Sequence, residues 1–215
     1  MRGDNHDAER DRQLILAVEQ ADDAPSLLAA VRALAAAPTE AAIPTLIAVL
    51  GYNNASAALA AVEGLIQLGD AAVPELIAKL DGYDYGARAY GMRALAAIAS
   101  PAALDVLLAA AATDFAPSVR RAAAKGLGII RWSKLSAEQI QPAQSQALET
   151  LLQLCQDPDW SIRYGAVVGL QALSSQPDVR GRIAAGFEQI AEKDPDPAVR
   201  ARVYLAQQVI LDSRF

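Results

Sequence analysis

The feature that most constrains this chain is a pair of helix-forming segments that recurs about every 30 residues. Leucines at corresponding places in the second segment of each pair stand at positions 34, 65, 95, 127 and 170. The first segments are short, with apolar residues three and four apart, at residues 41–50, 71–80, 101–110 and 145–154. This repeat predicts an all-α fold: a right-handed α-solenoid (superhelix) of about five to six helix pairs.

The second segments share a frame of residues that favours close helix packing. Counted from an arginine, the third residue is usually small, the sixth is Gly or Ala, and the seventh is Leu. The arginines that begin this frame are Arg88, Arg120 and Arg163, and Arg200 fits it loosely. Small side chains let neighbouring helix axes approach. The interval between the last two leucines is longer than the others, so we expect an insertion at about 131–146.

Composition limits the classes of function. Hydrophobic residues make up 53% of the chain but aromatic residues only 5%, which suits packed helices better than strands. No apolar run is long enough for a membrane span. The net charge of −6 disfavours nucleic acid as a partner. We expect residues 1–12 to be a flexible charged tail, residues 13–215 to form a single solenoid domain, and the protein to be cytoplasmic.

The titratable residues exclude some chemistry. The only histidine, His6, lies in the expected tail, so we predict no metal site and no Ser-His-Asp arrangement in the folded part. The only cysteine, Cys155, excludes an internal disulfide. It falls on the apolar stripe of a first helix, which predicts a buried structural thiol rather than a reactive one.

The loops before the later second helices carry a specific pattern, "DFAPSVR", "DPDWSIR" and "DPDPAVR". This pattern resembles the HEAT-like repeats of the phycobilisome lyase class. In such arrays the aspartate is expected to cap the second helix, and the arginine to bond to loop carbonyls and to acids of adjacent repeats. That structural interpretation competes with any functional role for Arg120, Arg163 and Arg200.

The resemblance extends to a subfamily. The blocks "YDYGARAYGMRALAAI", "SVRRAAAKGLGIIRW" and "DPDWSIRYGAVVGLQAL" are similar, in the same order, to the F (beta) subunits of CpcE/CpcF-type phycocyanobilin lyases. The resemblance implies a heterodimer with an E-type subunit that attaches phycocyanobilin, its substrate, to a cysteine of the phycocyanin α-subunit by a thioether bond. Detachment or transfer is also implied as an activity, and no cofactor is. The alternative is a non-catalytic HEAT-repeat adaptor that binds phycobiliproteins during chromophore removal or phycobilisome turnover.

Two stretches carry the residue types that a bilin needs. Propionates call for Arg, the ring face calls for Tyr or Trp, and a carboxylate would stabilise the protonated, more electrophilic bilin. We predict Asp84 as the catalytic residue and, as substrate-binding residues, Tyr83, Tyr85, Arg88, Tyr90, Arg93, Asp159, Trp160, Arg163 and Tyr164. The structural alternative is that these residues only cap and support the repeats. For the E-type partner, we expect the contact surface on the apolar repeats from Leu27 to Leu68.

Overall fold

The computed structural model describes residues 3–37, 39–80 and 85–212, and the regular structure in this part of the chain is helical throughout. The α-helices of residues 3–98 are α1 (Gly3–Glu19), α2 (Ala24–Ala35), α3 (Ile43–Val49), α4 (Ala55–Leu68), α5 (Val73–Leu80) and α6 (Tyr85–Ile98). Those of residues 104–212 are α7 (Leu104–Thr113), α8 (Pro117–Ile129), α9 (Ala137–Leu154), α10 (Trp160–Leu173), α11 (Pro177–Lys193) and α12 (Pro197–Asp212). Short 3-10 turns precede four of them: η1 (Glu40–Ala42), η2 (Gly69–Ala72), η3 (Pro101–Ala103) and η4 (Trp132–Lys134). The prediction of an all-α repeat fold is confirmed.

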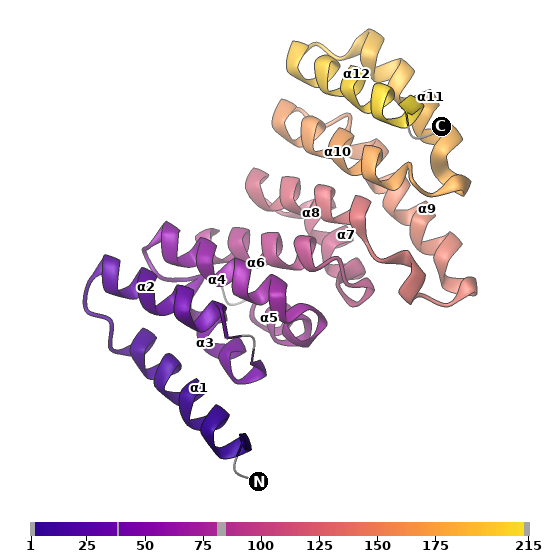
Figure 1. Cartoon of the computed structure of the whole chain (residues 1–215). Helices are drawn as coiled ribbons and strands as arrows, with labels where there is room; N and C mark the ends of the chain where they lie inside the picture. The colour runs from indigo at the N-terminus through magenta and orange to yellow at the C-terminus, as the bar shows by residue number, and fades with distance from the viewer. Residues whose placement is uncertain (1–2, 38, 81–84, 213–215) are drawn as a thin grey trace. The chain divides into compact units, whose positions relative to one another are not determined.

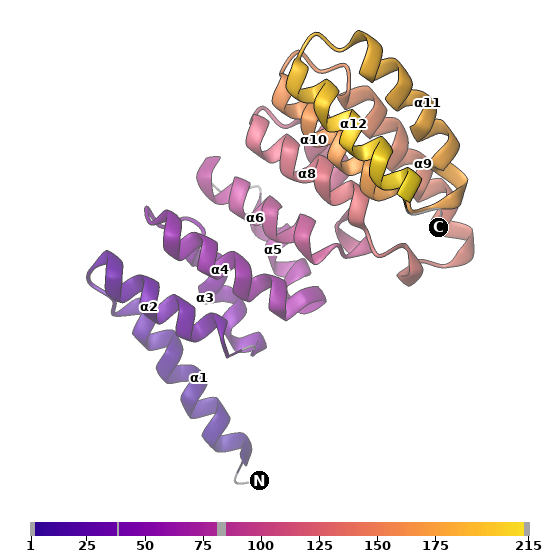
Figure 2. The same ribbon diagram turned by 45° about the horizontal axis from the view of Figure 1, so that its top comes forward.

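The chain divides into two compact units, unit 1 (Met1–Ile98) and unit 2 (Ala99–Phe215). Within each unit the helices form two layers. In unit 1, α2 packs on α4 and α4 on α6, while α3 packs on α5. In unit 2, α8, α10 and α12 lie side by side and α7, α9 and α11 form the other layer (Figures 1 and 2). We call α8, α10 and α12 the second-helix layer of unit 2.

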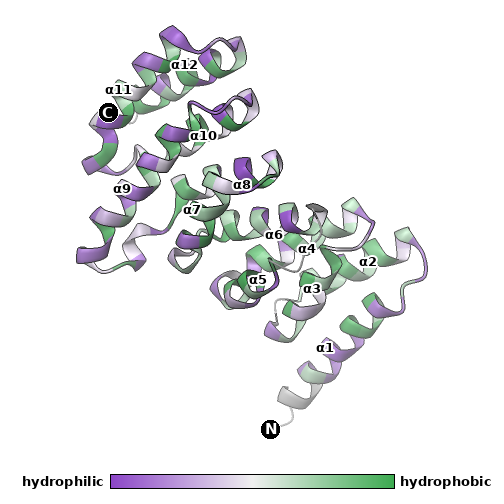
Figure 3. Cartoon of the chain, turned by 180° about the vertical axis from the view of Figure 1, so that it is seen from behind, coloured by the Kyte–Doolittle hydropathy of each residue, from purple (hydrophilic) through white to green (hydrophobic). Residues whose placement is uncertain are grey.

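The five leucines that define the repeat are the centre of the core. Each of them is fully buried: Leu34, Leu65, Leu95, Leu127 and Leu170. Burying one leucine side chain stabilises the fold by roughly 1.5–3 kcal/mol. Figure 3 shows hydrophobic residues along the helices of both units, with hydrophilic residues interspersed most clearly in α1 and α9. An amphipathic helix of this kind keeps an apolar face for its neighbours.

Glycines allow α8 and α10 to approach closely. A Cβ atom built on Gly128 would lie 2.2 Å from the carbonyl oxygen of Gly169, and one built on Gly169 would lie 2.3 Å from the carbonyl oxygen of Ala124. Neither position can hold a larger residue unless the two helices separate. Gly169, a small residue of the repeat frame, and Gly128, which follows the frame leucine Leu127, therefore set the spacing of α8 and α10.

Local signals set the helix boundaries. Asn54 ends the loop before α4 and accepts a hydrogen bond from the Ala57 N–H at 3.0 Å, as an N-cap residue does. Among the described residues, one stretch, Ala55–Leu80, is long and apolar enough to span a membrane by composition. Gly69, with a φ of 62°, breaks it into α4, η2 and α5. A core helix can pass the same test, and half of the most apolar 18-residue window of this stretch is buried inside the protein.

Two segments differ from the expected outline. Residues 3–12, which we expected to be a flexible tail, continue α1, and Arg12 pairs there with Glu9 at 2.9 Å. Residues 131–146, the expected insertion, form η4 and the beginning of α9, which has 18 residues where α7 has 10. The extra residues thus lengthen a first helix. The division into a tail of residues 1–12 and a single domain of residues 13–215 stays a prediction.

Candidate functional site

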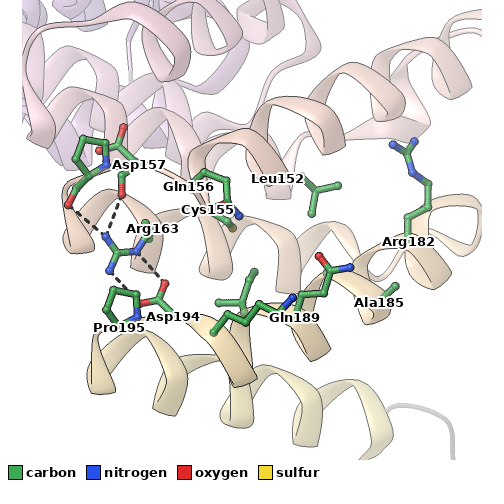
Figure 4. Close-up of a pocket in the computed structure, with 14 residues that line it drawn as sticks. Leu152, Cys155, Gln156, Asp157, Arg163, Arg182, Ala185, Gln189, Asp194 and Pro195 are labelled. Atoms are coloured by element: carbon green, nitrogen blue, oxygen red, sulfur yellow. Dashed lines mark hydrogen bonds and ion pairs between the residues drawn. The ribbon is translucent and has the colours of Figure 1, made fainter.

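Arginines at the start of second helices connect successive repeats of unit 2. Arg163 is buried, and its Nε and Nη2 donate to the two carboxylate oxygens of Asp194 at 2.8 and 2.9 Å (Figure 4). Its Nη1 donates to the carbonyl of Asp157 at 2.9 Å. One repeat earlier, Nη2 of Arg120 lies 2.6 Å from a carboxylate oxygen of Asp157. We call Arg120, Arg163 and Arg200 the arginine ladder. The structural interpretation is confirmed for Arg120 and Arg163, which bond to a backbone carbonyl at or beside the loop and to an acid of the next repeat, whereas within the described residues Arg200 has the bonds to loop carbonyls only.

The loop aspartates have a different local role from the one we expected. Asp157 accepts a hydrogen bond from the Asp159 N–H, and Asp194 accepts one from the Asp196 N–H, each at 2.9 Å. These bonds shape the loop two residues ahead, and the N-cap of α10 is Asp159 instead. The prediction that the first aspartate caps the second helix is therefore wrong, because that carboxylate must also reach the arginine of the preceding repeat.

Electrostatics keep the central ladder pair ionised. Burial alone raises the pKa of Asp194, but the hydrogen bonds from Arg163 and from the Asp196 N–H outweigh it and hold this pKa below its ordinary value. The Asp194 carboxylate in turn raises the pKa of Arg163. Four of the five N–H donors of Arg163 are used within unit 2, counting a 3.3 Å bond to the carbonyl of Pro158.

The predicted residues at the start of α10 present an aromatic surface. Trp160 is 49% exposed although it is a large apolar residue, and Tyr164, one turn later, is half-buried. Asp159 caps the helix by accepting bonds from the Ser161 N–H at 2.8 Å and the Ser161 hydroxyl at 2.7 Å. These bonds lower the pKa of Asp159, with a smaller contribution from the charge of Arg121, so its carboxylate is ionised at neutral pH.

The structure adds Arg121, which sequence reasoning missed, to this surface. A Cβ built on Gly165 would lie 3.4–3.5 Å from the Cα, Cβ and Cγ atoms of Arg121, so the arginine stem lies against α10 beside that glycine. Lys125, one turn further along α8, is exposed. The alignment of the repeats could have indicated Arg121. Arg120 and Arg163 occupy equivalent positions in their repeats, so Arg121 is equivalent to Tyr164. We call Arg121, Lys125, Asp159, Trp160 and Tyr164 the basic–aromatic cluster.

The predicted residues around α6 belong to unit 1. Tyr83 and Asp84 lie outside the described residues, and α6 begins at Tyr85. Further along α6, Arg88 and Tyr90 are half-buried and Arg93 is exposed. The candidates thus fall into two groups, one in each unit.

A cavity of about 760 Å³ lies in unit 2 between α9 and α11 (Figure 4). Its apolar lining includes Leu152, Cys155 and Ile190, and Arg182 and Lys193 add positive charge. Of the predicted site residues it contains only Arg163, which is bonded to Asp194. Burial raises the pKa of Cys155 to about 12, so the thiolate is scarce at neutral pH. The prediction that Cys155 is buried is confirmed.

Comparison with known proteins places this repeat in a family. A model of PBS lyase HEAT-like repeats matches residues 27–52 and 57–82, and models of HEAT repeats match residues 73–143 and 147–177. The chain is 56% identical over 195 residues to a phycocyanobilin lyase subunit beta from Nostoc sp. PCC 7120, covering 91% of this chain and 98% of that protein. The chain belongs to the family of phycocyanobilin lyase beta subunits.

Other members of the lyase beta-subunit family agree with this assignment. A phycocyanin alpha phycocyanobilin lyase, CpcF, from Synechocystis sp. PCC 6803 is 50% identical over 192 residues, covering 89% of this chain and 90% of its own length. Among solved structures, the complex of CpcE and CpcF of phycocyanin lyase from Nostoc sp. PCC 7120 contains a chain with a TM-score of 0.76 and 58% identity. The match covers 79% of this chain and 99% of that one.

Proposed function

We propose that this chain is the F-type (beta) subunit of a heterodimeric phycocyanobilin lyase. Together with an E-type subunit it attaches phycocyanobilin to a cysteine of the phycocyanin α-subunit, in the cytoplasm of a cyanobacterium. Support comes from family membership, from the CpcE and CpcF complex of the Nostoc relative, and from the charge and aromatic residues of the second-helix layer.

The main support for placing the site here is that the second-helix layer of unit 2 is basic although the whole chain is acidic. The chain has a net charge of −6, yet the second-helix layer of unit 2 contains six basic residues and, before Asp212 at the very end of α12, no acidic one. Three of the basic residues form the arginine ladder, and Arg202 donates to Gln171. Arg121 and Lys125 remain, and no carboxylate among the described residues lies within ion-pair distance of either. The stem of Arg121 lies against α10 beside Gly165, the residue that follows Tyr164, and Lys125 lies one turn further along α8. Cations and exposed aromatic residues in one helix layer suit an anionic ligand with a flat conjugated body.

The reaction requires positioning rather than a protein nucleophile. The acceptor thiol adds to the ethylidene carbon of bilin ring A: its S–H bond breaks, a C–S bond forms, and the proton is taken up by the ring, so no group leaves and no oxidant is needed. Arg121 and Lys125 would bind the propionates, and Trp160 and Tyr164 would stack on the rings. The ionised Asp159 would favour the protonated bilin, which is the better electrophile.

The α6 group stays part of the proposal. Asp84 as catalytic residue, with Tyr83 and Tyr85 beside it, rests on sequence alone. Arg88, Tyr90 and Arg93 supply the same residue types as the cluster of unit 2. Arg163 is the weakest of the proposed contacts, because its donors already bind Asp194 and loop carbonyls.

The test is co-production of the chain with an E-type partner, the apo phycocyanin α-subunit and phycocyanobilin, followed by measurement of covalently bound bilin. Losing one charge-assisted contact of about 1.5–3 kcal/mol lowers transfer at least roughly tenfold. We expect that loss for Arg121→Ala and for Lys125→Ala, with heterodimer assembly unchanged. The matched control is Lys193→Ala, an exposed lysine of α11 outside the second-helix layer.

The outcomes separate the two classes of function. Equal transfer by the wild type and by both cluster variants would refute the assignment of the cluster. A wild-type pair that binds phycocyanin but never forms the thioether bond would instead favour the non-catalytic adaptor.

A further inference from the structure

The arginine ladder is incomplete at α12, the last described helix. Nη1 of Arg200 donates to the carbonyls of Asp194 at 2.7 Å and Pro195 at 3.1 Å, as Nη1 of Arg163 does to Asp157 and Pro158. Nε and Nη2 of Arg163 go on to bind the next carboxylate, that of Asp194. For Nε and Nη2 of Arg200, the described part of the chain supplies no such carboxylate. Two charged donors of this half-buried arginine thus have no carboxylate partner in the described part of the chain.

Apolar side chains accompany these donors on the same stripe of α12. Tyr204 is 55% exposed and Leu211 is 54% exposed. Residues 200, 204 and 211 are four and seven apart, so they share one face of the helix. α12 packs on both α10 and α11, and its buried residues lie on a different face from this stripe: Val199, Val203, Ala206 and Ile210.

In the preceding repeat, the positions equivalent to this stripe are buried. Aligning Arg163 with Arg200 aligns Val167 with Tyr204 and Ser174 with Leu211. Arg163 and Val167 of α10 and Ser174, its C-cap residue, are all buried, at 7%, 0% and 5% exposure. The same stripe is thus buried in α10, whereas Tyr204 and Leu211 of α12 are more than half exposed.

We propose that this stripe of α12, Arg200 with Tyr204 and Leu211, is the surface on which the E-type partner subunit docks. The partner presents a carboxylate to Nε and Nη2 of Arg200 and an apolar helix to Tyr204 and Leu211, as a next repeat would. The identity of the partner rests on the proposed function, and the charge of Arg200 fixes the chemistry that it must offer. The segment from residue 203 to residue 211, "VYLAQQVIL", carries no charge of its own, so an apolar partner helix meets no repulsion there.

This location differs from the one that the sequence suggested, Leu27 to Leu68. In that range the exposed large apolar residues are Tyr52, in a loop, and Leu59, at 37% exposure on α4. Leu59 therefore provides a matched control, because it is an exposed leucine on a second helix of the other unit.

The experiment measures binding of the full-length chain to the E-type subunit, by co-purification and by a titration that yields Kd. We expect Leu211→Asp and Tyr204→Asp to raise Kd by about tenfold or more, since they place a charge in an apolar contact. Both side chains are more than half exposed, so the melting temperature of the isolated chain stays the same. Arg200→Ala has the same effect on Kd, whereas Leu59→Asp leaves Kd unchanged.

Each of the other possible results contradicts either the proposed function or the proposed docking surface. If the wild type does not bind the E-type subunit at all, the proposed function fails first. If the wild type binds it and both aspartate variants bind equally well, the docking surface is refuted while the proposed function stands. If Leu59→Asp alone weakens binding, the partner contacts the N-terminal repeats. If Leu211→Asp instead abolishes self-association of the chain, the stripe is occupied by a second copy.

Discussion

Replacing Arg163 by alanine tests the link between successive repeats. The change removes two charge-assisted bonds to Asp194, at 2.8 and 2.9 Å, and two bonds to loop carbonyls. It also leaves Asp194, which is only 8% exposed, without its counterion. Breaking a buried ion pair by removing one partner costs about 3–5 kcal/mol, mainly because a charge stays buried and unpaired. We therefore expect the free energy of unfolding of unit 2 to fall by about 4 kcal/mol.

Tryptophan fluorescence is suited to this measurement. The two tryptophans of the chain, Trp132 and Trp160, both belong to unit 2, and Trp132 is buried at 5% exposure. With a urea dependence near 2 kcal/mol per molar, the unfolding midpoint should move down by about 2 M. The control is Arg182→Ala on α11, whose partner Glu149 lies 3.9 Å away and whose side chain is 55% exposed. Such a surface pair contributes at most about 1 kcal/mol.

The pH dependence provides a second readout with a definite sign. In the wild type the pKa of Asp194 is held below its ordinary value, so its stabilising contribution is present at neutral pH and is lost as the pH falls through the folded-state pKa. Without Arg163, burial still raises this pKa, but the side-chain hydrogen bonds and the charge of Arg163 that lower it are gone, so the pKa of Asp194 is higher in the variant than in the wild type. The variant then binds a proton at a higher pH, and the gap in stability between the wild type and the variant narrows as the pH falls through the pKa of Asp194 in the variant. A variant within about 1 kcal/mol of the wild type at pH 7, or a gap that widens in acid, would refute the ladder as a buried ion pair.

Further predictions concern packing and the thiol. Gly128→Ala should destabilise unit 2 by about 2 kcal/mol or more, because the new Cβ would lie 2.2 Å from the Gly169 carbonyl oxygen; urea unfolding followed by tryptophan fluorescence checks this, and an unchanged midpoint would contradict the close approach of α8 and α10. Cys155 should not react with a disulfide reagent at pH 8 in the folded chain but should react at once in urea; rapid labelling of the native chain would contradict its burial. Since the folded pKa of Cys155 is about 12, its contribution to stability is full below about pH 8.5 and declines as the pH rises toward 12, and Cys155→Ser should weaken that decline in an alkaline titration.

The sequence by itself determined the elements and the core of this protein. Periodicity identified the second helices because an amphipathic helix must place its apolar residues on one face, and each of the repeated leucines, for example Leu127 and Leu170, is fully buried. The same stripe placed Cys155 in the core. The positions of the helices and the burial of their apolar stripe depend on residues close together in the chain, so the local spacing of apolar residues predicts them.

Only the tertiary structure decided which residues of different repeats meet. Arg163 and Asp194 are 31 residues apart; the resemblance to HEAT-like repeats predicted a bond to an acid of an adjacent repeat, but only the structure shows that the acid is Asp194 and that it accepts two bonds. Arg121 entered the candidate site because its stem lies against Gly165 on the neighbouring helix. Trp132 and Trp160 are the same residue type in similar polar surroundings of sequence, yet one is buried and the other half exposed. Such contacts depend on the distance and register between stacked helices. The packing of entire helix faces sets that distance and register, and small residues allow the close approach.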